Sequence, residues 1–390
     1  MQLQFAHRLL RKAISFVFVG TMFVALPVAN SIGQDKDVAE KPKSDEAKEE
    51  IKFDPPADAS VDELLAWINK VKRTPPPRDA VAETAKKLFP GIIQACDLIL
   101  EKCENNDEIK KALTEKFSAY SILVNYLPSA AKDLEQLANK YAADPRLEIA
   151  QIAVGQQLVS QSAKLRTATA ETAQGIADSA IQFLERFGAN RSTYSSVSRI
   201  ASGLGYSEHT EIAAVFHERL SKVLSTAEDE NLRKAASKMI GAARRIRLPG
   251  NEMELTGVTA DGKPFNWSEY KGKVVLVDYW ASWCGPCIAE LPNMKKNLET
   301  YGDKGFVIVG INMDDKRAAF EKCVEEKEIT WVNIVSEEEG KTGWNAPNAD
   351  YYGISGIPTA ILVNQQGKVV SIRARGKELD TKLEELLGGQ

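Results

Sequence analysis

A short apolar stretch that runs almost directly into a pair of cysteines constrains the fold of this chain more than any other feature. Residues 274–277 are Val-Val-Leu-Val, and residues 283–287 are Trp-Cys-Gly-Pro-Cys. A continuous apolar run of this length is typical of a strand buried in a parallel sheet. The segment 288–300, which follows Pro286, is predicted to be a helix. We therefore expect a central strand, a short turn, and a helix that begins at the cysteine pair.

The cysteine pair has the spacing of a reversible disulfide. Residues three apart at the start of a helix have Cα atoms roughly 5 Å apart, and a disulfide tolerates that separation. The helix N-terminus favours the thiolate form of Cys284, because its unpaired N–H groups stabilise negative charge. We expect Cys284 to face solvent and attack, and Cys287 to lie inside and resolve the mixed disulfide. Pro286 is compatible with the first helical turn, where no N–H bond is lost.

Three motifs carry a resemblance to a known family. Residues 277–287, Val-Asp-Tyr-Trp-Ala-Ser-Trp-Cys-Gly-Pro-Cys, resemble the active-site strand and turn of the thioredoxin superfamily. Residues 356–359, Gly-Ile-Pro-Thr, resemble its cis-proline loop, and Pro292 matches its helix-kinking proline. The chain also has room for an extra helix (318–326) and strand (330–335), as in the extracytoplasmic TlpA/ResA-like branch. This resemblance covers about a third of the chain and implies a thioredoxin-like α/β domain over residues 250–390.

The resemblance also implies roles for two carboxylates. Asp278 interrupts the apolar strand, so we expect it to be buried with a raised pKa. It is a candidate proton acceptor for Cys287; the alternative is an inert, hydrogen-bonded strand residue. Glu290 shares a helix face with Cys287, and a matching Glu marks the TlpA/ResA-like branch. Its alternative is an exposed carboxylate favoured by the helix dipole. Gly310 stands where thioredoxins often carry a lysine partner for the buried Asp.

The remaining site residues are expected to contact substrate. A cis bond before Pro358 would turn the backbone of Ile357 towards Cys284, where an extended substrate segment can pair with it. Trp283 is a candidate for a flat apolar rim, whereas Trp280 is expected in the core. The predicted substrate-binding residues are Trp283, Gly285, Pro286, Ile357, Pro358 and Thr359.

Residues 60–247 have a different character. They are rich in alanine and show repeated helical periodicity, which predicts an all-helical domain, either a bundle or a short solenoid. The sequence leaves two alternatives for the role of this domain, a spacer or a docking surface for a partner or substrate. The fold class is therefore multidomain, with an all-α N-terminal part and an α/β thioredoxin-like C-terminal domain. Helices are predicted from Leu64 and at approximately 79–104, 107–125, 128–142, 146–166, 171–187, 191–203, 209–226 and 229–246.

The N-terminus has the pattern of a targeting segment. Basic residues precede an apolar stretch at 13–29, and small residues follow it. We interpret residues 1–33 as a cleaved signal peptide, and the alternative is an uncleaved anchor that tethers the protein through 13–29. Either interpretation places the body of the protein outside the cytoplasm, in the periplasm or an equivalent compartment. Residues 34–59 are rich in Lys, Glu, Asp and Pro, which predicts a disordered charged linker.

Composition excludes several function classes. A formal net charge of −4 in 390 residues argues against a nucleic-acid partner. The five cysteines include no second Cys-x-x-Cys, so we expect no metal and no cofactor. Ile288, not His, follows the pair, so haem attachment is not indicated. Cys96, Cys103 and Cys323 are expected to be free, buried thiols.

The sequence therefore predicts an exported thiol–disulfide oxidoreductase that acts on protein disulfides. The Gly-Pro dipeptide resembles that of reducing thioredoxins, which favours a reductase supplied by a membrane or periplasmic thiol electron donor. One alternative is a helical partner-binding protein with an accessory redox domain. Another is a peroxidase of the wider redoxin group, although its Pro-x-x-x-Thr-x-x-Cys element is absent.

Overall fold

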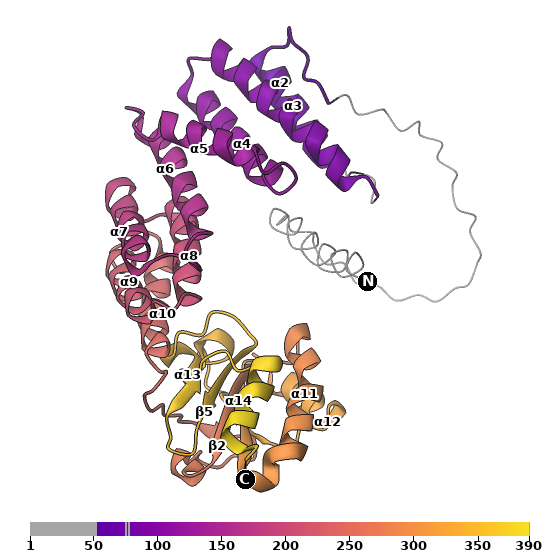
Figure 1. The fold of residues 1–390 in the computed structure, drawn as a ribbon, viewed down its shortest axis with the longest axis vertical. Helices are drawn as coiled ribbons and strands as arrows, with labels where there is room; N and C mark the ends of the chain where they lie inside the picture. Colours follow the sequence, from indigo (N-terminus) through magenta and orange to yellow (C-terminus); the bar gives the residue numbers. More distant parts are fainter. Residues whose placement is uncertain (1–52, 75, 77–78, 390) are drawn as a thin grey trace, which may run out of the picture. The chain divides into compact units, whose positions relative to one another are not determined.

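A computed structural model describes residues 53–74, 76 and 79–389 (Figure 1). The predicted signal segment (1–33), its apolar stretch and most of the predicted linker lie outside these residues. Among the helices that the structure describes, none combines the length and the apolar character needed to cross a membrane.

The helical part follows the predicted order of helices closely. Several of its helices begin at residues whose side chains accept hydrogen bonds from the first free backbone N–H groups, such as Ser60, Thr169 and Asn190. One apolar cluster joins α6 to α10, and another joins α4, α5 and α6. The helices are α2 (Val61–Arg73), α3 (Val81–Lys102), α4 (Asn106–Leu123), α5 (Ala130–Tyr141), α6 (Leu147–Ser162), α7 (Ala170–Phe187), α8 (Arg191–Gly205), α9 (Thr210–Leu224) and α10 (Glu230–Ile246).

Residues 53–59 differ from the expectation of a disordered linker. The Lys102 ammonium at the end of α3 donates to the carbonyls of Ala57 and Ala59, at 3.2 and 2.9 Å. The carbonyl of Phe53 lies so close to Gly91 that a Cβ on this glycine would be 1.9 Å from it. The linker prediction was therefore wrong for these residues, because they pack against α3.

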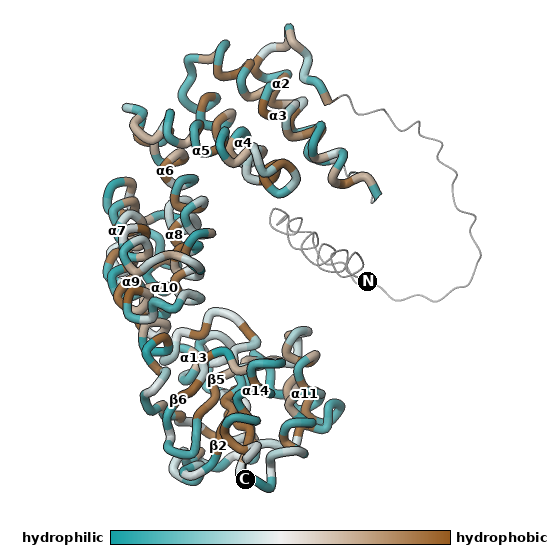
Figure 2. Tube along the Cα trace, viewed as in Figure 1, coloured by the Kyte–Doolittle hydropathy of each residue, from teal (hydrophilic) through white to brown (hydrophobic). Residues whose placement is uncertain are grey.

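The C-terminal part is built on a six-stranded mixed sheet in the order β1-β4-β3-β2-β5-β6. Strand β2 is central and buried at every position, parallel to β3 and antiparallel to β5. Figure 2 shows the hydrophobic residues concentrated along it. The extra helix and strand predicted from the sequence are present as α12 and β4. The strands are β1 (Val258–Thr259), β2 (Val274–Trp280), β3 (Phe306–Asn312), β4 (Val332–Val335), β5 (Thr359–Val363) and β6 (Val369–Ser371).

Helices and loops connect these strands and place the cysteine pair at the end of β2. Helix α11 begins directly after Cys284 and contains Pro292 within it. The helices of this part are η1 (Trp267–Tyr270), α11 (Gly285–Tyr301), η2 (Gly302–Lys304), α12 (Arg317–Glu326), η3 (Gly343–Asn345), α13 (Pro347–Tyr351) and α14 (Lys377–Leu387).

Candidate active site

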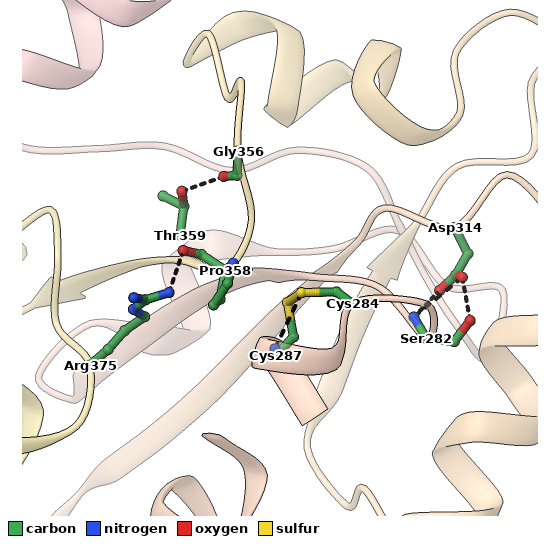
Figure 3. Close-up of a disulfide and its surroundings, with 8 residues drawn as sticks. All are labelled: Ser282, Cys284, Cys287, Asp314, Gly356, Pro358, Thr359 and Arg375. Atoms are coloured by element: carbon green, nitrogen blue, oxygen red, sulfur yellow. Dashed lines mark hydrogen bonds between the residues drawn. A yellow bond between two sulfur atoms is a disulfide. The ribbon is translucent and has the colours of Figure 1, made fainter. Parts of the chain in front are cut away.

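The cysteine pair forms a disulfide at the start of α11 (Figure 3). The sulfurs of Cys284 and Cys287 are bonded at 2.03 Å, and their Cα atoms lie 5.2 Å apart. Cys284 is the N-cap residue, and its Sγ accepts the N–H of Cys287 at 3.2 Å. Both residues are buried, with 4% and 3% of their surface exposed. The expectation that Cys284 faces solvent was therefore wrong for the disulfide form, because Cys284 packs in the apolar core of the domain.

The proline loop (residues 356–359) leads into β5. Strand β5 pairs with β2, the strand that leads to the cysteines. The Ile357–Pro358 bond is cis, as expected. Thr359 pairs with Tyr279 of β2, and its hydroxyl donates to the carbonyl of Gly356 at 2.7 Å. Figure 3 places Gly356, Pro358 and Thr359 in the surroundings of the disulfide. Ile357, Pro358 and Thr359 are partly exposed, which leaves this loop accessible.

Two tryptophans form an exposed aromatic surface next to the pair. Trp283 immediately precedes Cys284 and has 57% of its surface exposed, while Trp280 is buried, as predicted. The ring of Trp344, in η3, lies 6.2 Å from that of Trp283 and is 39% exposed. Gly285 and Pro286 are also exposed. The sequence could not place Trp344, because its loop is distant from the cysteines along the chain.

Asp278 is buried in β2, as the sequence predicted. Its pKa is raised to about 7, mainly by burial and also by the Glu290 carboxylate, whereas Arg375 opposes the shift. Gly310 lies opposite Asp278 on β3, so no lysine partner is present at that position. Asp278 therefore titrates near neutral pH, where it can accept or release a proton.

Glu290 is half-buried and accepts hydrogen bonds, which differs from the exposed carboxylate considered as an alternative. Its Oε1 accepts the backbone N–H of Gly376 at 2.7 Å and the side-chain amide of Asn293 at 3.1 Å. Gly376 is the N-cap residue of α14. The carboxylate therefore connects α11 to the start of α14.

The sequence did not indicate two further contributions to this site. The Arg375 guanidinium donates to the carbonyl of Pro358 at 2.8 Å and holds the proline loop (Figure 3). Asp314 is buried and accepts the N–H and the hydroxyl of Ser282, at 3.0 and 2.6 Å. The position of Asp314 just after β3, at the carboxyl edge of the sheet, was the signal that could have identified it.

The other cysteines are free thiols, and no group of His, Cys, Asp and Glu in the described part of the chain could hold a metal ion. Cys96 and Cys323 are buried, and burial raises the pKa of Cys96 to about 12. Cys103 is only partly buried, which corrects the prediction. It follows the end of α3, where its thiol donates to Glu108 at 2.7 Å.

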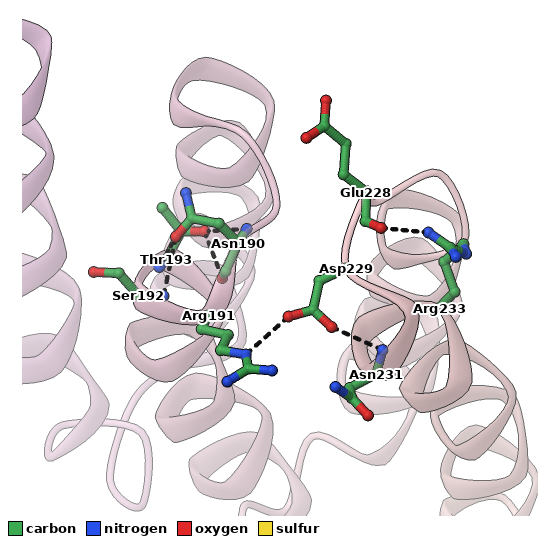
Figure 4. Close-up of polar contacts among 8 residues, drawn as sticks. All are labelled: Asn190, Arg191, Ser192, Thr193, Glu228, Asp229, Asn231 and Arg233. Atoms are coloured by element: carbon green, nitrogen blue, oxygen red, sulfur yellow. Dashed lines mark hydrogen bonds and ion pairs between the residues drawn. The ribbon is translucent and has the colours of Figure 1, made fainter.

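A separate cavity of about 1110 Å³ lies between α7 and α9, next to the loops that lead into α8 and α10. It is lined by apolar residues such as Leu184 and Val223 and by charged residues at the helix ends. The Arg191 guanidinium and the Asp229 carboxylate, 2.8 Å apart, join the starts of α8 and α10 (Figure 4). No residue of the disulfide site lines this cavity.

Comparisons with known proteins agree with this geometry. Residues 241–387 match the family model Redoxin. The C-terminal domain belongs to the Redoxin family. The chain is 29% identical over 129 residues to the thiol-disulfide oxidoreductase ResA of Bacillus thuringiensis, covering 33% of this chain and 69% of that protein. ResA of Bacillus subtilis is 28% identical over 112 residues, which cover 29% of this chain and 59% of that protein.

A solved structure also shares sequence with the C-terminal part of the chain. The thioredoxin domain of a thiol-disulfide oxidoreductase from Bacteroides vulgatus is 30% identical, covering 36% of this chain and 97% of that domain, with a TM-score of 0.33. The match to Redoxin, the relatives named thiol-disulfide oxidoreductases and the Cys284–Cys287 disulfide together identify the C-terminal domain as a thiol–disulfide oxidoreductase of thioredoxin-like fold.

Proposed function

We propose that this protein is an exported reductase of protein disulfides, with Cys284 as the attacking thiolate. The observation that carries the proposal is the disulfide between Cys284 and Cys287 at the N-terminus of α11, beside the proline loop and after the strand that contains the buried Asp278. The N–H of Cys287 already points at Cys284 Sγ, at 3.2 Å. The same N–H would stabilise negative charge on that sulfur after reduction.

The proposed exchange has two steps. The Cys284 thiolate attacks one sulfur of the substrate disulfide, the substrate S–S bond breaks, and its second sulfur leaves as a thiolate that takes a proton. Asp278 then accepts the proton of the Cys287 thiol, and the Cys287 thiolate attacks Cys284 Sγ. The mixed disulfide breaks, and the substrate sulfur that Cys284 had attacked leaves as a thiolate that takes a proton. Two electrons pass to the substrate, and the domain ends as the disulfide.

The same loops provide the proposed substrate contacts. An extended segment beside its disulfide would pair with the backbone of Ile357 and lie over Trp283, whose ring is more than half exposed. Thr359 and the exposed Gly285 and Pro286 border the same opening. Backbone pairing is independent of side-chain identity, which favours unfolded or extended protein segments over one small molecule.

The N-terminal sequence supports the proposed location of the reaction. Export through residues 1–33, with cleavage, would place the domain in an oxidising compartment such as the periplasm. A reductase there must be reduced again after each turnover, so we propose a membrane or periplasmic dithiol protein as its electron donor. The uncleaved form of the segment would tether the protein through residues 13–29.

Trapping tests this proposal directly. A Cys287→Ser variant should accumulate mixed disulfides through Cys284 with protein substrates, because the resolving thiol is absent. The matched Cys284→Ser variant should trap nothing. Absence of any trapped protein with the Cys287→Ser variant would count strongly against the catalytic role of the pair. Equilibration with glutathione should give a potential near about −270 mV, and a value above about −180 mV would reverse the proposed direction.

A second candidate function places the biological role in the helices. The cavity between α7 and α9 has apolar walls and a charged border, which favours binding of a partner there. The two functions differ in their need for the cysteines. A Cys284→Ser protein would keep its biological role if partner binding is the function, and would lose it if disulfide reduction is.

A further inference from the structure

Helix α10 crosses the redox domain at a contact between two glycines. A Cβ on Gly241 of α10 would lie 2.3 Å from the backbone nitrogen of Gly353, and a Cβ on Gly353 would lie 2.2 Å from the nitrogen of Ala242. Gly353 has a φ of 56°, a conformation that other residues adopt only with strain. The two backbones are therefore in direct contact, and α10 and α13 lie side by side (Figure 1). The Redoxin match begins at residue 241, inside α10.

Arg245 strengthens this contact one turn further along α10. Its side chain is partly buried, and its Nη1 donates to the carbonyls of Tyr352 and Gly353, both at 2.6 Å. A guanidinium that donates to carbonyls fixes backbone direction, because its N–H groups form a rigid planar fork. Gly353 lies four residues before Ile357 of the proline loop. Arg245 therefore anchors the base of that loop to α10.

Lys238 makes the corresponding contact one turn before Gly241. Its ammonium donates to the backbone carbonyl of Trp344 and pairs with the Asp350 carboxylate at 2.8 Å. The ring of Trp344 lies beside that of Trp283 at the cysteine pair. The Trp344 loop and the proline loop border the redox site. Helix α10 therefore contacts the segment between them near both ends, through Lys238 at Trp344 and through Arg245 at Gly353.

We propose that the C-terminal half of α10 is part of the redox site and positions residues 344–357 for exchange with protein disulfides. Lys238, Gly241 and Arg245 are positioning residues in this arrangement. The helical array is then a fixed support for the substrate-binding segment and more than a spacer. The inference rests on the disulfide reductase function proposed above. It assigns no chemical step to α10, because none of its residues touches the sulfurs.

Substitutions in α10 test this with two probes. Arg245→Met removes both bonds to the loop, and Gly241→Ala forces the two backbones apart. Each should lower the rate at which the reduced protein reduces insulin by roughly tenfold, because loss of orientation is expensive in exchange reactions. The rate with glutathione disulfide, which needs no extended contact, should stay within about twofold of wild type. Hydrogen exchange of residues 344–357 should become faster in both variants.

Two other residues of the helical part provide matched controls. Arg233, also on α10, donates through Nη1 to the carbonyls of Ala227 and Glu228, at 2.7 and 2.6 Å, within the helical part. Arg233→Met removes an equivalent pair of bonds far from the loop. Gly175 of α7 has nothing within 4 Å of an added Cβ, so Gly175→Ala controls for the added methyl group. Both controls should keep the wild-type rate with insulin.

Several outcomes would overturn the inference. Unchanged insulin rates and unchanged hydrogen exchange in Arg245→Met and Gly241→Ala would show that α10 does not position the loop. An equal loss with both probes would indicate general destabilisation instead. If neither variant folds, Lys238→Met makes the same test through the contacts of Lys238 with Trp344 and Asp350. A wild-type protein that reduces neither insulin nor glutathione disulfide would refute the proposed function itself, which is a separate result.

Discussion

Gly310 lies directly opposite Asp278 in the parallel pairing of β3 with β2. A Cβ on Gly310 would lie 2.0 Å from Oδ1 of Asn333 and 2.9 Å from Nε1 of Trp280. These two side chains are hydrogen-bonded to each other at 2.9 Å. The place of the lysine expected by resemblance is therefore filled by a buried hydrogen bond. The cation that lowers the pKa of Asp278 is instead Arg375, from the loop before α14.

The raised pKa of Asp278 predicts a specific pH dependence of stability. Folding raises this pKa from 3.8 to about 7, so the folded state keeps a proton that the unfolded chain has lost. The contribution of this group to stability is therefore complete below pH 4 and is lost as pH rises towards 7. Between pH 5 and pH 8 the loss is about 3 kcal/mol, from 1.36 kcal/mol per pKa unit. Asp278→Asn should remove this slope.

Urea unfolding of the oxidised proteins at pH 5 and pH 8 measures the effect. Other groups titrate in this range, so the informative quantity is the difference between wild type and Asp278→Asn at each pH. Equal slopes in the two proteins would show that Asp278 is already ionised at pH 5 in the folded state.

The filled space beside Gly310 predicts a coupling between two substitutions. Gly310→Ala should destabilise the domain by about 2 kcal/mol, because the new methyl group collides with Asn333. Asn333→Ala alone should cost a similar amount, roughly 2 kcal/mol, since it leaves the indole N–H of Trp280 without its partner. The double variant should be less destabilised than the sum, by about 1 kcal/mol or more. Strict additivity in urea unfolding would contradict this account.

The sequence was most informative where local pattern decides the structure. The apolar run 274–277 could only be a buried strand, and the start of α11 at Cys284 follows from the spacing of the pair and from Pro286. The helices of the N-terminal part were predictable for the same reason. The periodicity of apolar residues along a helix and the capping residues at its ends are both local features of the sequence. The burial of Asp278 also followed from its position inside the apolar strand.

Contacts between distant segments could not be predicted in this way. Glu290 meets the N–H of Gly376, and Arg245 meets the carbonyl of Tyr352, across long stretches of chain. Each partner is a backbone group, and the residue types in a sequence do not show which backbone groups a distant side chain will contact. Cys103 was assigned to the core by its residue type, yet its place at the end of α3 leaves it partly exposed.

The anchoring of the turn before the cysteines gives a further prediction. Asp314 accepts two hydrogen bonds from Ser282 and one from the side-chain amide of Asn312 at 2.7 Å. Asp314→Asn replaces one acceptor oxygen by a donor that faces other donors, so it should destabilise the domain by about 2 kcal/mol. Ser282→Ala removes only the hydroxyl and should cost about 1 kcal/mol.

The rate of alkylation of reduced Cys284 by iodoacetamide reports on the same turn. Asp314→Asn should change this rate more than Ser282→Ala does, because it places a donor against the N–H or hydroxyl donors of the turn, whereas Ser282→Ala only removes one hydroxyl. If both variants react like wild type and unfold at the same urea concentration, the Asp314 contact does not hold the turn.

Glu290 can be tested by separating its hydrogen bond from its charge. Glu290→Gln keeps an oxygen that can accept the N–H of Gly376, whereas Glu290→Ala loses this bond and should cost about 1 kcal/mol of stability. Both variants remove the negative charge that helps to raise the pKa of Asp278, so both should lower the pH at which Asp278 titrates. Carboxyl chemical shifts of Asp278 measured against pH would show this shift.

The rate at which Cys287 resolves the mixed disulfide then decides whether the negative charge of Glu290 has a role beyond anchoring α14. If Glu290 passes protons to or from Cys287, Glu290→Gln and Glu290→Ala should slow the release of product from a preformed mixed disulfide by similar factors, about tenfold or more. If the carboxylate serves only as an acceptor for Gly376, Glu290→Gln should release product at the wild-type rate while Glu290→Ala alone is impaired. The glutamine variant thus distinguishes proton transfer from structural anchoring, because it differs from wild type in charge and keeps the hydrogen-bonding oxygen.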